Sequence, residues 1–236
     1  MNKVDKKGKL YLIPTTLGDD VLHTIPTYVV REIQRIEIYI GERAKTARRF
    51  LKAAGIDKAL STITVHELDK HNPINGISEF LQPALEGHDI GLLSEAGCPG
   101  VADPGAEVVS LAHRIGIDVV PLVGPSSILL ALMASGMNGQ SFTFHGYLPP
   151  KVGDRTHALR KLEQKAPRTT SIFIETPYRN QQMIETVLKT LHPQTRFCIA
   201  ADLTLETEYI ATKTIAAWQK TTIPNLHKRP AIFLIG

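Results

Sequence analysis

The sequence is poor in the features that build disulfide frameworks and membrane spans. It has only two cysteines among 236 residues, Cys98 and Cys198, and they lack CxxC spacing. A reduced compartment fits this usage best, although two cysteines still permit a single disulfide. The longest apolar run, 128–134, is far shorter than the ~20 residues that span a bilayer, so it predicts a buried helix instead. The charged start, MNKVDKKGKL, has no secretory core, and we expect a cytoplasmic protein without membrane contacts.

Several common catalytic signatures are also missing. The sequence has no GxxxxGK[ST] phosphate loop, no GxGxxG after a strand, no HExxH, no GxSxG and no Cys/His spacing suited to zinc. Its nine histidines are scattered along the chain. These absences disfavour an NTPase, a Rossmann dehydrogenase, a zinc enzyme and an α/β-hydrolase, and no metal is expected.

The charge is mildly positive, with a formal net charge of +4, and the cations are clustered. Five lie in residues 43–52, and six more lie in residues 151–168. Such clusters are most often solvated helix faces, but they also suit a polyanionic partner.

Residues 91–105, GLLSEAGCPGVADPG, are the most informative stretch. An apolar strand leads into a loop rich in Gly and Pro, and a helical pattern starts after Gly105. This arrangement presents backbone N–H groups at the C-terminal edge of a sheet, so it predicts a small-ligand site. The alternative is an ordinary strand-to-helix connection, although such connections are usually only about 2–6 residues long.

Strands and helices alternate through the first half of the chain, which predicts a mostly parallel sheet. A strand at 117–123 is nearly all apolar and is expected to be buried on both faces. Gly124-Pro125-Ser126-Ser127 then precedes a helix, where the two serines either cap the helix or meet a polar ligand. The other expected strands are 9–13, 36–40 and 62–65, the expected helices start at 26 and span 43–54 and 77–85, and 66–76 is expected to be a polar loop.

The second half follows a different pattern. Its expected strands are 141–145, 170–175, 196–201, 208–214 and 231–235, and its expected helices are 154–165 and 178–191. Residues 206–214 are expected to pair antiparallel with the closing strand. The fold class is therefore α/β: two α/β domains, 1–122 and 123–236, with mixed, largely parallel sheets. A ligand cleft is expected between them.

Six segments in order carry a family resemblance: GKLYLIPTTLGD, SEAGCPGVADPG, VVPLVGPSS, FHGYLPPK, PRTTSIFIETPYR and CIAADLTLETEY. Together they resemble the tetrapyrrole methylase superfamily of S-adenosylmethionine-dependent methyltransferases. Within it, the chain is most similar to the branch that 2′-O-methylates a ribose in small-subunit ribosomal RNA, the ribosomal RNA small subunit methyltransferase I family. The resemblance implies S-adenosyl-L-methionine as methyl donor, ribosomal RNA or the small ribosomal subunit as partner, and a homodimer.

The resemblance also implies which residues form the sites. The donor would contact the first loop, the 91–105 loop, the 124–127 junction and the second domain: Pro14 and Leu17; Ser94, Gly97, Cys98, Val101 and Asp103; Ser126 and Ser127; Tyr147, Leu148, Ala200, Ala201 and Ala231. This donor needs close backbone contacts and no phosphate cradle, and Gly97 and Gly100 would permit that approach. Binding of the RNA is assigned to six arginines and lysines: Arg48, Arg49, Lys151, Arg155, Arg168 and Arg179.

A ribose hydroxyl must lose a proton during methylation, and three carboxylates are candidates to accept it. Asp103 and Glu175 are taken as the catalytic residues, with Glu42 as the third candidate. Asp103 could instead cap the helix that follows it, and Glu175 could instead pair with Arg179.

The chain departs from the family pattern at several positions. The usual E-D-T-R is Glu42-Arg43-Ala44-Lys45, and Glu95, Cys98 and Tyr178 replace Asp, Thr and His. Two alternatives to RNA methylation therefore stay open. One is methylation of a corrin, another tetrapyrrole or another small molecule, and the other is a non-catalytic ligand-binding member of the fold.

Overall fold

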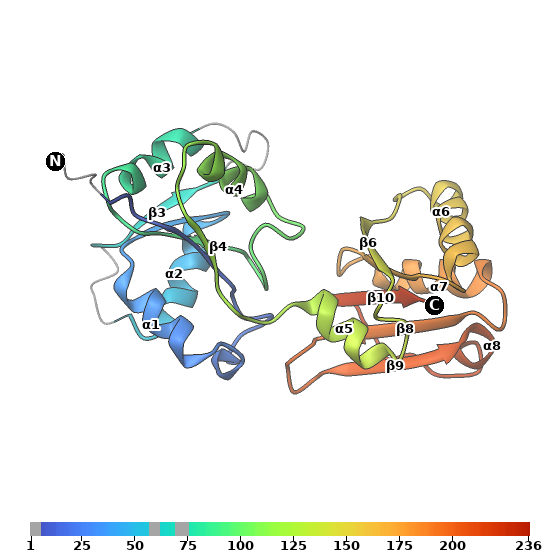
Figure 1. Cartoon of the computed structure of the whole chain (residues 1–236). Helices are drawn as coiled ribbons and strands as arrows, with labels where there is room; N and C mark the ends of the chain where they lie inside the picture. The colour runs from blue at the N-terminus through green and yellow to red at the C-terminus, as the bar shows by residue number, and fades with distance from the viewer. Residues whose placement is uncertain (1–5, 57–61, 69–75) are drawn as a thin grey trace. The chain divides into compact units, whose positions relative to one another are not determined.

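The computed structural model describes residues 6–56, 62–68 and 76–236. The chain divides into two compact units, Met1–Ser126 and Ser127–Gly236, each with its own five-stranded sheet (Figure 1). The division falls at 126/127, whereas the sequence placed the boundary at 122/123. Of the polar loop expected at 66–76, residues 69–75 lie outside the described residues.

The first unit contains a parallel sheet with strand order β3-β2-β4-β1-β5, which confirms the expected alternation of strands and helices. Each of its four strand pairings is parallel. The strands are β1 (Leu10–Ile13), β2 (Ile38–Gly41), β3 (Thr64–Glu67), β4 (Ile90–Leu93) and β5 (Val119–Pro121). The helices are η1 (Leu22–Thr24), α1 (Thr27–Arg35), α2 (Ala44–Ala53), α3 (Ile77–Leu85) and α4 (Gly105–Arg114).

Helices cover both faces of this sheet because side chains alternate along each strand. α1 and α2 pack on one face, in a core with Ile13 and Leu93. α3 and α4 pack on the other face, in a core with Leu10 and Leu92, and Figure 1 shows them above the sheet with α1 below it. The chain therefore leaves the neighbouring strands β1 and β4 toward opposite faces. This arrangement is a topological switch point, where open α/β sheets bind ligands.

The burial predicted for residues 117–123 is wrong. β5 is the last strand in the sheet order and pairs with β1. Val119 and Val120 are only half-buried, and Pro121 is exposed. A proline has no N–H to donate, which suits it to an edge strand. An apolar run here marks an edge strand with one covered side, not a strand buried on both faces.

The second unit contains a mixed sheet with strand order β6-β7-β10-β8-β9. Only β6 and β7 run parallel in the described sheet, and the other three pairings are antiparallel. β9 pairs with β8, so the predicted antiparallel pairing exists but the closing strand β10 is not its partner. The strands are β6 (Phe142–Tyr147), β7 (Thr170–Ile174), β8 (Arg196–Ala201), β9 (Tyr209–Thr214) and β10 (Ala231–Ile235). The helices are α5 (Ser127–Ser135), α6 (Val152–Lys165), α7 (Asn180–Thr190) and α8 (Ile215–Trp218).

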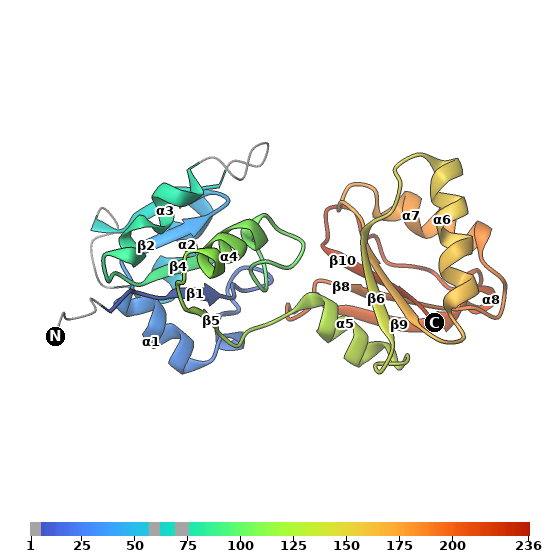
Figure 2. The ribbon, with the colours of Figure 1, turned by 45° about the horizontal axis from the view of Figure 1, so that its top comes forward.

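The helices of the second unit differ in how much of their surface they bury. α6 and α7 lie side by side and share the main core with β7, β8 and β10 (Figure 2). α5 packs against β8, β9 and β10 and buries Ala131 and Leu132. Leu129 is 50% exposed and Met133 is 78% exposed, so the helix expected to be buried at 128–134 exists but is buried only in part. Among the described residues, no helix is long and apolar enough to cross a membrane.

Gly91 provides a direct test of how tightly the first sheet is packed. A Cβ atom on Gly91 would lie 2.7 Å from Cδ1 of Tyr39 and 2.8 Å from Cδ1 of Ile13. The Tyr39 ring has little freedom to move, because its hydroxyl donates to the Ile33 carbonyl at 2.6 Å. We expect Gly91→Ala to lower the free energy of unfolding of the first unit by about 1–3 kcal/mol.

The matched control is Gly41→Ala in the neighbouring strand β2, where the new Cβ would make ordinary contacts at 3.7–3.9 Å. Its effect should stay within about 0.5 kcal/mol. Urea titrations followed by far-ultraviolet circular dichroism measure both variants, while fluorescence of the single tryptophan, Trp218, reports on the second unit. Equal midpoints for the two variants would contradict the packing argument.

Candidate functional site

Two loops meet at the C-terminal edge of the first sheet, where β1 and β4 pair in parallel with Ile13 opposite Leu93. Thr15 and Gly97 exchange two backbone hydrogen bonds, at 3.0 and 3.2 Å, so the loop after β1 is fastened to the loop after β4. The Ser94 hydroxyl donates to the Gly97 carbonyl at 2.5 Å and lies 3.3 Å from the Thr15 hydroxyl. Thr15 and Ser94 are both buried, so these hydroxyls hold the two loops together.

A third segment, residues 121–126, reaches the same edge. A Cβ atom on Gly124 would lie 2.3 Å from Cβ of Pro14, so only glycine permits this approach. Gly97 has a φ of +79°, and a Cβ there would lie 3.3 Å from Cδ2 of Leu17. The Cys98 thiol donates to the Pro125 carbonyl at 3.5 Å. The structure thus brings the predicted donor residues of the first unit together: Pro14, Leu17, Ser94, Gly97 and Cys98, with Val101, Asp103 and Ser126 on the same connected segments.

Asp103 holds the shape of the loop after β4. Its Oδ1 accepts the backbone N–H groups of Gly100 at 2.7 Å and of Gly105 at 2.8 Å. Burial raises the pKa of the Asp103 carboxyl and nearby Glu42 adds to the rise, against the lowering effect of the two backbone hydrogen bonds. The N-cap residue of α4 is Pro104, so Asp103 is not the cap itself, but its two backbone hydrogen bonds fit a structural role in the loop better than the role of proton acceptor.

A pocket of about 670 Å³ opens beside these loops, on the side of α2. Leu17, Ser94 and Arg49 of the predicted site residues line it. The other lining residues come from the loop after β1, from α2 and from the end of β4: Thr15, Thr16, Gly18, Asp19, Asp20, Val21 and Leu22; Thr46, Ala47, Phe50 and Ala53; Glu95 and Ala96. The volume falls within the range of about 300–1,000 Å³ that is usual for ligand pockets.

The α2 helix presents a positive surface beside this pocket. It carries Lys45, Arg48, Arg49 and Lys52, all exposed, and contains no acidic residue. Arg49 is paired with Asp19 at 3.3 Å, but their side chains are 68% and 72% exposed, so the pair stabilises little. Like charges three and four residues apart repel on a helix, so this face favours an external polyanion.

Apart from Ser127, the predicted donor residues of the second unit lie at one edge of its sheet, where β6, β7 and β8 end and β10 begins. Ala231 pairs with Ala201 at this edge, and Tyr147 pairs with Ile174. Tyr147 is exposed, whereas Leu148, Ala200, Ala201 and Ala231 are buried. Ser127 is the first residue of α5 and is half-buried.

Glu175 lies at this edge but is engaged. Its Oε1 accepts the N–H of Thr176 at 2.7 Å and two N–H groups of Arg179, at 2.6 and 3.0 Å. Glu175 is 4% exposed, and its Oε2 is buried without a hydrogen-bond partner. A buried, paired carboxylate is poorly placed to take a proton from a substrate, so the ion-pair alternative describes Glu175 and Arg179 best.

The basic residues predicted to contact phosphates in the second unit do not form one surface. Arg155 is 1% exposed, which corrects the expected phosphate contact, since α6 turns this side chain into the protein. Arg168 precedes β7 and therefore lies at the opposite edge of the sheet from Glu175, which follows β7. Lys151 is exposed just before α6, at the edge where β6 ends.

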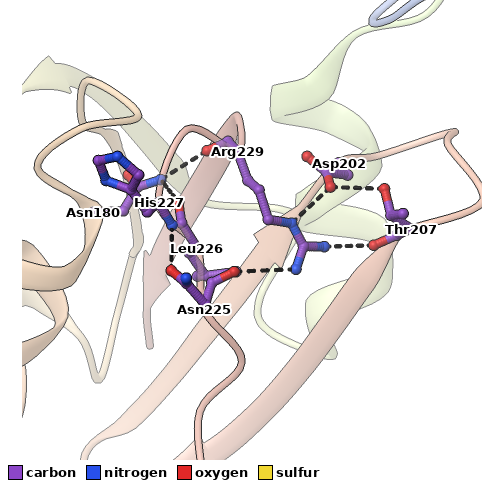
Figure 3. Close-up of polar contacts among 7 residues, drawn as sticks. All are labelled: Asn180, Asp202, Thr207, Asn225, Leu226, His227 and Arg229. Carbon is purple, nitrogen blue, oxygen red and sulfur yellow. Dashed lines mark hydrogen bonds and ion pairs between the residues drawn. The ribbon is translucent and has the colours of Figure 1, made fainter.

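Sequence reasoning missed a polar network at the edge where β8 ends and β10 begins (Figure 3). Arg229 donates from Nε to Asp202 Oδ2 at 2.7 Å and from Nη2 to the Thr207 carbonyl at 2.5 Å. The Thr207 hydroxyl donates to the same Asp202 oxygen at 2.8 Å. Buried Asn180 donates to the carbonyls of Leu226 and Arg229, at 3.0 and 2.7 Å. No local sequence signal identifies this network, because its members lie on separate segments of the chain.

This network anchors a backbone held in an uncommon conformation. Asp202 and Thr204 have φ values of +50° and +74°. A β-branched residue such as threonine rarely adopts the left-handed region, so the loop after β8 is strained. Within the described residues, no group of three histidines, cysteines or carboxylates could hold a metal ion.

Comparisons with known proteins agree with the motifs. The family described as Tetrapyrrole (Corrin/Porphyrin) Methylases matches residues 9–218. Ribosomal RNA small subunit methyltransferase I of Halalkalibacterium halodurans is 33% identical over 184 residues, which cover 78% of this chain and 61% of that protein. The proteins of the same name from Escherichia coli O157:H7 and Mesorhizobium japonicum are 32% and 34% identical. Those two matches cover 87% and 88% of this chain, and 69% and 68% of the relatives.

Two solved structures share the fold. The methyltransferase CobJ matches with a TM-score of 0.65 and 16% identity, over 97% of this chain and 94% of that chain. Uroporphyrin-III-C-methyltransferase from Thermus thermophilus matches with a TM-score of 0.56 and 18% identity, over 97% and 92% of the two chains. At these identities, the likeness concerns the fold alone.

The pKa of Asp103 generates a pH-dependent prediction. Because folding raises this pKa, the protonated carboxyl stabilises the fold at low pH, and that contribution is lost as pH rises through the folded-state pKa. Asp103→Asn keeps a carbonyl oxygen for the N–H groups of Gly100 and Gly105 but carries no charge. We therefore expect its stability relative to the wild type to increase as pH rises from about 4 through the folded-state pKa of Asp103.

Urea titrations at several pH values measure this difference, and exposed Asp118→Asn provides the control. Asp103→Ala removes the acceptor, so hydrogen exchange at the Gly100 and Gly105 amides should become faster. A stability difference between Asp103→Asn and the wild type that is independent of pH would contradict the account.

The Asp202–Arg229 network generates a second prediction. Lysine can contact Asp202 but cannot also donate to the Thr207 carbonyl, so Arg229→Lys should lower the free energy of unfolding of the second unit by about 1–3 kcal/mol. Exposed Arg160→Lys is the matched control. Trp218 is buried in this unit and reports its unfolding by fluorescence during urea titration. A urea midpoint of Arg229→Lys equal to those of Arg160→Lys and the wild type would show that the network does not stabilise the second unit.

Proposed function

The chain belongs to the Tetrapyrrole (Corrin/Porphyrin) Methylases, and on that premise we propose that it is an S-adenosylmethionine-dependent methyltransferase acting on a ribose 2′-hydroxyl of small-subunit ribosomal RNA. The names of its relatives support small-subunit ribosomal RNA as the substrate, whereas the ribose 2′-hydroxyl is taken from the resemblance of the six sequence segments. The observation that carries the proposal is the exposed cationic face of α2 beside the pocket at the ends of β1 and β4. Matches to curated relatives cover only part of their length, so activity and substrate are both parts of the proposal.

The segments at the edge of the first sheet fit the proposed methyl donor. Gly97 and Gly124 let backbone segments come close together, and the sequence has no phosphate loop, which this donor does not need. When bound, S-adenosylmethionine supplies an electrophilic methyl group on a sulfonium. We assign its binding to Pro14, Leu17, Ser94, Gly97, Cys98, Val101, Asp103 and Ser126 in the first unit, with Ser127, Tyr147, Leu148, Ala200, Ala201 and Ala231 in the second.

The residues around the donor mainly orient the reactants and exclude water, because methyl transfer is a single displacement. The paired loops of Thr15 and Gly97 and the contacts of Asp103 are suited to this task, since they fix the backbone without using flexible side chains. The Ser94 hydroxyl donates to a carbonyl within the loop. Ser94 is therefore proposed to shape the donor site and not to act as a base.

The RNA is proposed to lie along α2. Its phosphates would meet Arg48 and Arg49, and Lys151 of the second unit adds a further exposed cation. Electrostatic contacts to phosphates make binding salt-dependent, with a slope of about −0.7 to −0.9 in log K against log salt for each neutralised phosphate. This dependence separates a polyanionic acceptor from a small one.

The proposed acceptor also implies a cellular compartment for the enzyme. Ribosomal RNA places the enzyme in the cytoplasm, and both Cys98 and Cys198 are free thiols, as a reducing compartment favours. The homodimer implied by the family resemblance is part of the proposal, and sedimentation of the purified chain tests it.

A tetrapyrrole acceptor is the second candidate, supported by the fold shared with CobJ and with uroporphyrin-III-C-methyltransferase. It predicts methyl transfer to a corrin or porphyrin precursor without salt-sensitive RNA binding. Incubation with labelled donor, in the presence of small ribosomal subunits or of tetrapyrroles, distinguishes the two. The RNA proposal fails if label enters no RNA under conditions where the donor binds.

Removing the charges of α2 tests the RNA interface directly. We expect the double variant Arg48→Ala/Arg49→Ala to weaken binding to small-subunit RNA and to reduce the salt slope by about 2. Binding of the donor, measured by calorimetry, should be unchanged. Lys220→Ala, an exposed cation in the second unit, serves as the control. An unchanged salt slope in the double variant would remove α2 from the interface.

A further inference from the structure

The pocket beside α2 contains a carboxylate without an assigned role, Glu95, which stands where the family pattern has Asp. Three acidic residues line it: Asp19, Asp20 and Glu95. Asp19 and Asp20 are exposed, and Asp19 is paired with Arg49. Glu95 is half-buried and follows directly after Ser94 at the end of the central strand β4. Glu95 is therefore the carboxylate most shielded from solvent among the three.

The backbone around Glu95 is well fixed. Ser94 donates its hydroxyl to the Gly97 carbonyl, and Gly97 pairs with Thr15 through the backbone. These bonds hold the residues on both sides of Glu95 but use none of its own carboxylate oxygens. A side chain that performs chemistry benefits from such support, because its geometry is set before the substrate arrives.

The pocket adjoins the loop assigned to the methyl donor. Leu17 and Ser94 belong to both, whereas Cys98, Val101 and Asp103 of the donor loop are not among the residues that line the pocket. A transfer reaction requires two adjoining sites, one for each reactant. The pocket is therefore placed to receive the acceptor while the glycine-rich part of the loop holds the donor.

The chemistry of the pocket suits a nucleoside. Phe50 and Leu22 supply apolar surface for a base, Thr16 and Thr46 supply hydroxyls for a sugar, and Arg49 places a positive charge at its exposed rim. The volume of about 670 Å³ lies within the range of ligand-binding pockets.

We propose that this pocket receives the acceptor nucleotide and that Glu95 is the catalytic residue that takes the proton of its ribose hydroxyl. The inference rests on the proposed function. The hydroxyl O–H bond breaks as the proton moves to a carboxylate oxygen of Glu95, and the ribose oxygen forms the new bond to the methyl carbon. The carbon–sulfur bond of the sulfonium breaks, and its electron pair stays on sulfur.

Glu95 takes this role because Asp103 and Glu175, the two carboxylates taken from the sequence as catalytic, are otherwise engaged. Oδ1 of Asp103 accepts two backbone N–H groups that shape the loop, and Glu175 is buried in an ion pair of the second unit. Neither lines the pocket. A general base must be ionised and must lie within hydrogen-bond reach of the hydroxyl whose proton it takes, and Glu95 is proposed to meet both requirements.

The test compares Glu95→Gln with the wild type in single-turnover methyl transfer to small ribosomal subunits, with labelled donor and subunits both saturating. We expect the rate to fall by about 10²–10⁴-fold, with donor and RNA affinities unchanged. The acid limb of the pH–rate profile should disappear in this variant. Glu95→Asp should recover part of the rate, since it restores a carboxylate on a shorter side chain.

Two control variants sharpen the result. Glu79→Gln changes an exposed carboxylate of α3, outside the pocket. Glu107→Gln changes an exposed carboxylate of α4. Both should transfer methyl groups at rates within about threefold of the wild type, because neither is asked to take the proton.

The possible outcomes distinguish a failure of the role of Glu95 from a failure of the proposed function. If the wild type methylates RNA and Glu95→Gln retains its rate and pH profile, the role of Glu95 is overturned while the proposed function stands. The same holds if Asp20→Asn, which tests another carboxylate lining the pocket, abolishes transfer while Glu95→Gln does not. A fall in donor or RNA affinity that accounts for the whole loss of rate makes Glu95 a structural residue. A wild type that transfers no methyl group to RNA overturns the proposed function and, with it, this inference.

Discussion

The candidate site depends on one short piece of backbone pairing, the two hydrogen bonds between Thr15 and Gly97. The loops after β1 and β4 leave the sheet toward opposite faces, so chain connectivity alone would let them separate. Their pairing closes this switch point and fixes the position of Ser94, Glu95 and Leu17 relative to each other. It also requires glycine at 97, because the backbone there has a positive φ and Leu17 and the Pro125 carbonyl are close.

The remaining polar groups of the loop are used to hold this arrangement, and that decides which side chains are left for chemistry. Asp103 satisfies two backbone N–H groups, and the Ser94 hydroxyl satisfies a carbonyl. Groups that are already hydrogen-bonded and partly buried are costly to redirect toward a substrate. Of the three carboxylates that line the pocket, that of Glu95 is the most shielded from solvent, and it is the one assigned to proton transfer.

Much of the fold followed from the sequence, because alternation of apolar runs with Gly and Pro marks strands and helices well. The helix predicted at 77–85 and the strands predicted at 196–201 and 231–235 match the structure at both ends. Properties that depend on neighbours distant in sequence did not follow. The edge position of β5 exposes Pro121, and α6 buries Arg155 although its charge suggested a surface. The Asp202–Arg229 contact joins residues whose pairing no local pattern encodes.

The α2 helix shows why the cationic surface is better explained by function than by folding. Its four cations form four like-charged pairs at spacings of three and four, each unfavourable by about 0.2–0.5 kcal/mol. The helix keeps its place because Ala47, Phe50 and Leu51 are buried against the sheet, and because a Glu67 oxygen accepts the N–H of Ala44 at its start. Tertiary packing thus offsets the repulsion between these cations, which contributes nothing to the stability of the fold. A bound polyanion would convert that repulsion into attraction, and the pocket with Glu95 lies directly beside the same helix.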